Sequence, residues 1–147
     1  VTDMSAMFID CSSLTSLDLS NFDTSNVTTM QSMFQDCRAL KTLNVSNFDM
    51  TKVTDVQHMF HNCESLEVLD LSNWNVYNRA KRYQITENCP SLHTVRLDNC
   101  DNATIQIVLY DIEHLTNDVG VEKKIYCQKK NTTGLVAPNP WKFVYID

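Results

Sequence analysis

Apolar and polar residues follow one another along this chain in a pattern that recurs every 26 residues. In the first copy, four apolar residues lie at i, i+3, i+4 and i+7, the spacing of one helix face: Met4, Met7, Phe8 and Cys11. The segment 17–20 then alternates apolar and polar residues, as a strand with one buried face does. The pattern therefore predicts a short helical arm, a turn and a short strand in each copy.

The recurrence is strong enough to predict the architecture. The copies 1–26 and 27–52 are identical at 13 of 26 positions, the third copy is 53–78, and a degenerate fourth copy is 79–104. A unit of this size cannot bury its own apolar stripe, so we expect the copies to stack into an α/β solenoid whose strands form one parallel sheet.

Residues 105–147 leave the repeat and are expected to cap the stack. Three segments at this end are rich in Ile, Val and aromatic residues, and each is predicted to be a strand: Ala103–Tyr110, Lys123–Lys129 and Trp141–Ile146. The sequence thus predicts a β-rich C-terminal cap. Val1 stands at the start of a copy, so we also expect further repeats or a cap upstream of this chain.

One phrase of the repeat resembles a known family. M-F-x-x-C-x-x-L-x-x-L-D-L-S-N-F-D begins at Met7 and includes the L-x-x-L-x-L spacing of Leu14, Leu17 and Leu19. It is similar to the BspA-like leucine-rich repeats of bacterial surface proteins, and the similarity covers residues 1–104. The resemblance implies a leucine-rich repeat solenoid with a concave parallel sheet, arms on the outside, and export to the cell surface.

Composition removes several function classes. The chain has 2 glycines, Gly120 and Gly134, which are too few for a dinucleotide-binding fingerprint and too far apart for a P-loop or a nucleophile elbow. Its net charge is -6, with three basic and ten acidic residues in 1–78, so we expect no nucleic-acid partner. No run of 18 apolar residues occurs, so we expect no membrane insertion by this chain. A leader and an anchor, if used, would lie outside it.

The six cysteines fall into two groups. Four recur at the same repeat position: Cys11, Cys37, Cys63 and Cys89. Zinc ligands usually come in pairs two to four residues apart, so this spacing favours a column of buried, reduced thiols over ladder disulfides or a metal site. Cys100 and Cys127 lie outside the column, and in an oxidising compartment they could form a disulfide between the last repeat and the cap.

No catalytic residue, metal site or other cofactor is predicted. His58 and His61 lie three residues apart on one predicted arm and could contact one metal ion, but no third ligand has a suitable spacing, which favours a solvated outer face. Neither His93 nor His114 has a Ser or Cys in a recognisable nucleophile motif. Carboxylates on an exposed strand face, such as Asp18, have no feature that would adapt them to acid–base catalysis.

The candidate ligand-binding residues point outward from the predicted strands. They form three columns: Ser16, Thr42, Val68 and Thr94; Asp18, Asn44, Asp70 and Arg96; and Ser20, Ser46, Ser72 and Asp98. Short polar side chains suit an extended protein or glycan ligand, although Ser and Thr also fit strands for structural reasons alone. The columns contain no aromatic anchor, so binding through them alone is expected to be weak.

Three functions follow in decreasing order of preference. The first is a non-catalytic extracellular module at the cell surface that adheres to host matrix proteins, host receptors or other cells. The second is a structural spacer that carries another surface domain. The third, of low weight, is part of a secreted enzyme.

Overall fold

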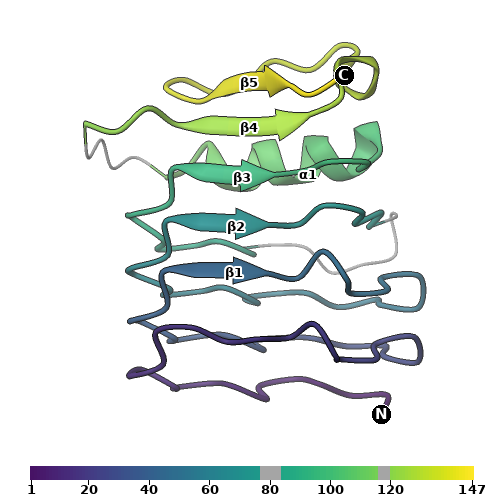
Figure 1. Ribbon diagram of the computed structural model, residues 1–147, viewed down its shortest axis with the longest axis vertical. Helices are drawn as coiled ribbons and strands as arrows, with labels where there is room; N and C mark the ends of the chain where they lie inside the picture. The colour runs from purple at the N-terminus through teal and green to yellow at the C-terminus, as the bar shows by residue number, and fades with distance from the viewer. Residues whose placement is uncertain (77–83, 116–119) are drawn as a thin grey trace.

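The computed structural model describes residues 1–76, 84–115 and 120–147. Its strands are β1 (Thr42–Asn44), β2 (Val68–Asp70), β3 (Thr94–Arg96), β4 (Lys124–Cys127) and β5 (Lys142–Tyr145). They form one all-parallel sheet in the order β1-β2-β3-β4-β5, with the two ends of the chain at opposite ends of the stack (Figure 1). The predicted parallel sheet is confirmed, and its regularly spaced strands are consistent with a repeat solenoid.

Strand register follows the repeat. Leu43 pairs with Leu69 and Leu69 with Val95, and all three side chains are buried. The first copy is an exception, because residues 14–19 are irregular rather than a strand. A long hydrogen bond of 3.5 Å from Lys41 N to Thr15 O joins this segment to the next copy. The prediction of a strand at 17–20 was therefore wrong, since a strand needs a regular ladder of hydrogen bonds to its neighbour.

The arms, residues 4–11 and their counterparts 30–37, 56–63 and 84–89, consist of turns, so the prediction of helical arms was wrong. Within an arm, Ile9 N donates to Ala6 O at 3.1 Å, whereas Phe8 N donates to Met33 O of the next copy at 2.9 Å. Every N–H of an α-helix interior bonds within the helix. Because alternate N–H groups here bond to the neighbouring copy instead, the backbone cannot wind into one.

The core consists of columns that run through the copies. Phe34 stacks on Phe8 and on Phe60, with ring centroids 5.5 and 5.7 Å apart. The predicted cysteine column is present beside it. Cys37, Cys63 and Cys89 are buried and Cys11 is partly buried, and all four are free thiols. Each buried thiol donates to a main-chain carbonyl of the preceding copy, as Cys63 Sγ does to Phe34 O at 3.2 Å.

The cap is only partly β-structured. Helix α1 (Asn102–Ile112) occupies the segment 103–110 that was predicted to be a strand. Two local features explain the helix: Asp101 accepts a hydrogen bond from Thr104 N at 2.8 Å as its N-cap, and its buried residues follow helical spacing. β4 and β5 confirm the other two predicted strands, and a 3-10 helix, η1 (Lys129–Thr132), lies between them.

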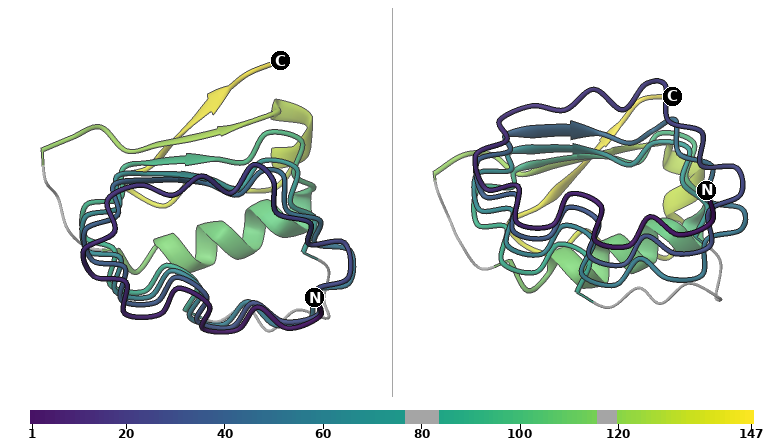
Figure 2. Two further views of the ribbon diagram at one scale, coloured as in Figure 1. Left: turned by 60° about the horizontal axis from the view of Figure 1, so that its bottom comes forward. Right: turned by 90° about the horizontal axis from the view of Figure 1, so that it is seen from below.

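Helix α1 lies on the side of the stack away from the strands, where the arms of the earlier copies lie (Figure 2). It therefore takes the place of a further arm, while β4 and β5 continue the sheet. Of the helices in the described part of the chain, none has the length and apolar character needed to cross a membrane.

Candidate functional site

The outward-pointing residues of β1 to β5, called here the sheet face, form the first candidate site. Pairing places three of the predicted residues side by side in one column, Thr42, Val68 and Thr94, and three in the next, Asn44, Asp70 and Arg96. All six are exposed or half-buried. Ser16, Asp18 and Ser20 are exposed in the irregular first copy, whereas Asp98 is half-buried. Ser72, predicted to point outward, is buried, and its hydroxyl accepts a 3.3 Å hydrogen bond from Asp98 N.

The carboxylate and amide groups of this face have a local structural role. Asp18, Asn44 and Asp70 each accept the backbone N–H two residues later, at 2.9, 2.9 and 3.0 Å. The same Asx turn recurs at four arm and corner positions: Asp3, Asp23, Asp49 and Asp55. The hydrogen bonds from the Ser20 hydroxyl and backbone hold the pKa of Asp18 below its ordinary value. Six of these seven turns have the pattern Asp/Asn-x-Ser/Thr, and Asp55 is followed by Gln57 instead. The pattern therefore serves first to form turns.

A hollow opens beside the first two copies. Its volume is about 290 Å³, and four of its lining residues belong to the predicted columns: Asp18, Ser20, Asn44 and Ser46. A second hollow, of about 400 Å³, lies at the corner between the last copy and the cap, with Asn75, Asp101 and Lys130 among its lining residues. Neither His93 nor His114 lines either hollow.

The cap extends the sheet face and supplies the aromatic residue that the repeat columns lack. Arg96 on β3 pairs with Tyr126 on β4, and its guanidinium lies over the tyrosine ring, 4.8 Å from the centroid. Arg96 also forms an ion pair with Asp98, whose hydrogen bond raises the pKa of the guanidinium. Lys124 and Lys142 continue the neighbouring column and both lie near Glu122, at 3.2 and 3.9 Å.

Sequence analysis missed Tyr126 as a member of this site because residues 105–147 share no repeat register with the copies. The alternation Lys124–Cys127 showed a strand but not its neighbour. Only the parallel pairing of β3 with β4 places Tyr126 next to Arg96. The repeat columns contain no aromatic anchor, as stated from the sequence, and the complete sheet adds Tyr126 from the cap.

The buried thiols are poorly suited to act as nucleophiles. Burial raises the pKa of Cys37 to about 11 and that of Cys89 to about 12, so both stay protonated at neutral pH. Cys100 and Cys127 are likewise buried free thiols, and burial raises their pKa values to about 12 and about 11. Cys100 Sγ donates to Leu71 O at 3.3 Å. A disulfide between Cys100 and Cys127 stays a prediction that depends on the redox compartment.

The histidines lie in three settings. His58 and His61 come together with Glu87, and one ligand atom from each lies within 4.8 Å of the others. The prediction that no third ligand was available was wrong, because stacking places residue 87 beside residue 61, its equivalent in the preceding copy. His93 bonds to the Thr94 hydroxyl at 2.8 Å and lies 4.0 Å from Glu67. His114 packs edge-on against Tyr110, with ring centroids 5.5 Å apart.

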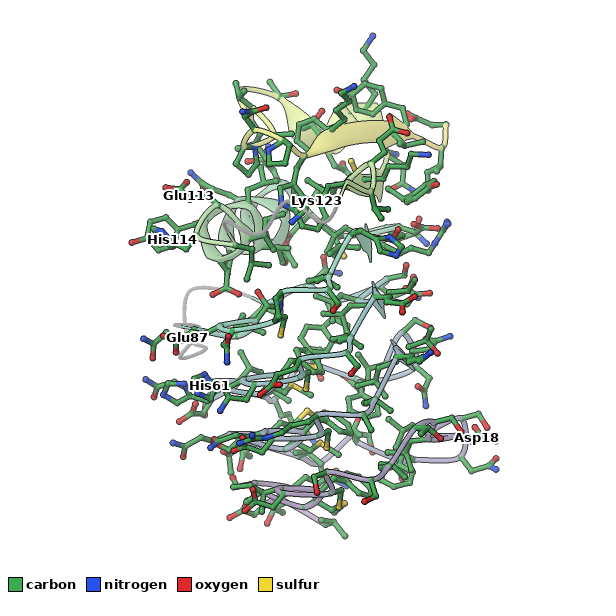
Figure 3. All side chains as sticks on the ribbon, turned by 90° about the vertical axis from the view of Figure 1, so that its left-hand side faces the viewer. Asp18, His61, Glu87, Glu113, His114 and Lys123 are labelled. Atoms are coloured by element: carbon green, nitrogen blue, oxygen red, sulfur yellow. The ribbon has the colours of Figure 1, made fainter. Side chains whose placement is uncertain are left out.

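Figure 3 shows His61 and Glu87 one above the other on the opposite side of the molecule from Asp18. Asp18 belongs to the predicted ligand-binding columns, so the histidine cluster and the sheet face are separate surfaces.

Comparison with known proteins places the repeats in a family. No curated protein and no solved structure matches the chain at a significant level. Residues 1–100 match the family described as "Mycoplasma protein of unknown function, DUF285". The match spans the three regular copies and most of the fourth, which is more than half of the sequence. The chain therefore belongs to the DUF285 family.

Proposed function

We propose that this chain is a non-catalytic, BspA-like leucine-rich repeat module at the cell surface, which binds an extracellular protein through its sheet face. The pair Arg96–Tyr126 carries the proposal. Arginine and tyrosine are enriched among the residues that dominate binding energy in protein interfaces. The guanidinium stacked on the ring holds both side chains in place before binding, so little rotamer entropy is lost when a partner covers them.

The surroundings of this pair suit an interface. Short side chains lie beside it toward the repeats, Val68 and Asp70 on β2 and Thr94 on β3, so a partner can approach this part of the sheet closely. Acidic Asp18 and Asp70 lie toward the first copy, and Lys124 and Lys142 lie toward the cap. This separation of charge would orient a partner along the stack.

The non-catalytic part of the proposal is supported by the roles of the candidate chemical groups. Asp18 and Asp70 serve as Asx-turn acceptors, and the column thiols are buried and protonated. The remaining histidines, His93 and His114, contact other side chains and do not face a described hollow.

A binding experiment with two matched double variants tests the proposal. The purified chain is passed over individual immobilised extracellular-matrix proteins by surface plasmon resonance. Arg96→Ala with Tyr126→Ala removes the pair from the sheet face. Arg38→Ala with Tyr110→Ala removes one exposed arginine and one exposed tyrosine elsewhere, and serves as the control. We expect the first variant to weaken binding by roughly tenfold or more, and the control by less than about twofold.

The outcomes separate the candidate functions. Equal losses in both variants would contradict a sheet-face site. If binding of the chain disappears when the immobilised matrix protein is deglycosylated, the ligand is a glycan. Failure of the unmodified chain to bind any matrix or cell-surface protein would favour the spacer function.

A further inference from the structure

The second surface, the cluster of His58, His61 and Glu87, has the composition of a metal site. His58 and His61 belong to the third copy and Glu87 to the fourth, and the ladder between these arms fixes their relative position. Asn62 N donates to Glu87 O at 3.0 Å, and Phe60 N donates to Ile85 O at 2.8 Å. The three side chains thus project from a rigid backbone framework formed by two adjacent copies.

One nitrogen atom of each histidine in the cluster lacks a hydrogen-bond partner within the described structure. His58 Nδ1 and His61 Nδ1 are both buried and accept or donate no hydrogen bond within the described structure. His61 Nδ1 lies 3.1 Å from Glu87 Oε2, but without hydrogen-bond geometry. Buried polar atoms without partners are uncommon in folded proteins, and an unfilled ion site is one explanation for them. Two such nitrogen atoms beside one carboxylate form a set of ligand atoms that could coordinate a cation.

We propose that His58, His61 and Glu87 bind a divalent transition-metal ion, zinc being the best fit, with the remaining coordination positions open to water. Two imidazoles and one glutamate are a ligand set that zinc accepts in proteins, at about 2.0–2.2 Å from each donor atom. Tetrahedral geometry at those lengths sets neighbouring donor atoms roughly 3.4 Å apart. The separation between His61 Nδ1 and Glu87 Oε2, 3.1 Å, is already close to this value, and the wider separations can close by side-chain rotation.

The backbone conformation of His58 is common to all four copies. His58 has a left-handed φ of 57°, yet so do Ala6, Ser32 and Gln84 at the same position of the other copies. The left-handed turn is a feature of every arm. What distinguishes the third and fourth copies is the chemistry of the side chains that this turn presents.

The site would join the third copy to the degenerate fourth. In the fourth copy Thr86 occupies the position of the stacked ring Phe60, so this junction has lost one aromatic contact of the column. An ion held by residues 58, 61 and 87 ties the two arms together on the outside. Because zinc would bind the folded chain and not the unfolded chain, its binding must stabilise the fold against unfolding.

The test measures zinc binding to the chelator-treated chain by isothermal titration calorimetry, together with its melting temperature with and without zinc. We expect one equivalent of zinc to bind and the melting temperature to rise. His58→Ala and Glu87→Gln should each lower the affinity by roughly tenfold or more, because each removes one of three ligands.

His93→Ala is the matched control. His93 and Glu67 also occupy one repeat position in adjacent copies, but no second histidine accompanies them within the described structure. This variant should change zinc affinity by less than about twofold. Cobalt substitution checks the ligand type, since a nitrogen–oxygen site lacks the intense thiolate-to-cobalt charge-transfer band that cysteine ligation would produce.

Three results would overturn the proposal. They are the absence of saturable zinc binding, unchanged affinity in His58→Ala, and a thiolate band in the cobalt spectrum. Circular dichroism of each variant establishes that a loss of binding does not arise from unfolding.

Discussion

The regular copies and the cap satisfy the same backbone groups by different means. Between regular copies, main-chain N–H groups donate to main-chain carbonyls, as Phe34 N does to Met59 O at 2.9 Å. At the last copy this ladder meets helix α1, whose own carbonyls are used within the helix. The Asp111 carboxylate accepts hydrogen bonds from Ile85 N and Thr86 N at 3.1 and 2.7 Å, and also from the Thr86 hydroxyl.

Other side chains of the cap act in the same way. Thr104 Oγ1 accepts from Val76 N at 2.9 Å, and Asn131 Nδ2 donates to Cys100 O at 3.0 Å. Gln128 exchanges hydrogen bonds with both the backbone N–H and the side chain of Asn99, which in turn donates to Asn73. Asn73 and Asn99 occupy the same position in the third and fourth copies. On the side of the arms and corners, the stack therefore ends where side chains replace the backbone partners of the next layer. On the strand side, β4 and β5 continue the backbone pairing.

The largest expected effect concerns the loss of a stacked ring from an inner copy, compared with the same loss from the first copy. Phe34→Ala should lower the free energy of unfolding by about 3–5 kcal/mol, because the ring is fully buried between two others. Phe8→Ala removes the same group from the half-buried first copy and should cost about 1–2 kcal/mol. Urea unfolding of both variants measures the difference. Equal losses would contradict a core that is shared by stacked layers.

The next prediction tests the side-chain termination of the ladder at Asp111. Asp111→Ala leaves the N–H groups of Ile85 and Thr86 without their acceptor and should cost about 2–4 kcal/mol. Thermal and urea unfolding at neutral pH measure this loss. A cost below about 0.5 kcal/mol would mean that water replaces the carboxylate and that the ladder end needs no side chain.

The same carboxyl makes a pH-dependent contribution. Burial raises the pKa of Asp111 above its ordinary 3.8, so the folded chain binds a proton more readily than the unfolded chain. The stability that Asp111 contributes must then increase as pH falls from neutral toward 3.8. We expect the difference in unfolding free energy between the unmodified chain and Asp111→Ala to widen over that range. The exposed carboxylates, present in both proteins, cancel in this difference. A gap that narrows on acidification would contradict the raised pKa.

The repeat made much of this fold predictable, and the exceptions have identifiable causes. The 26-residue shift predicted the register of β1, β2 and β3 because identical layers stack in register. Apolar spacing identified the buried residues of each arm but assigned them to a helix, since Met30, Met33 and Phe34 have helical spacing. The backbone partner in the next copy, which decides between turn and helix, leaves no local pattern in the sequence.

Contacts between layers explain what was missed at the candidate sites. Glu87 became a partner of His61 only through stacking, although both occupy one position of the aligned repeat and could have been found there. Tyr126 offered no such signal, because the link from β3 to β4 has a different length and includes a helix. In a repeat protein, aligned positions of adjacent copies are therefore spatial neighbours, whereas contacts of the cap need the structure.

The smallest expected effect concerns residues with a left-handed backbone conformation, which are of different types in the repeats and in the cap. The repeats place non-glycine residues there, such as Ser32 with φ 54°, whereas the cap places Gly120 and Gly134 at φ 70° and 75°. An L-residue in this conformation is strained by roughly 1–2 kcal/mol, and replacing it with glycine removes that strain. Glycine also gives the unfolded chain more conformational freedom, which offsets part of the gain in stability. We expect Ser32→Gly to stabilise the chain by about 0.5–1 kcal/mol.

Gly134→Ala is the converse substitution in the cap. Among the described residues, no heavy atom beyond Gly134 and its two chain neighbours lies within 4 Å of the added methyl group, so the cost isolates the backbone conformation and should be about 1 kcal/mol. Thermal unfolding of both variants at one pH compares them directly. If Ser32→Gly were destabilising, the hydrogen bonds of the arm, such as Ser32 N to Gln57 O at 2.9 Å, would hold the turn without strain. The scarcity of glycine in the repeats would then carry no energetic cost.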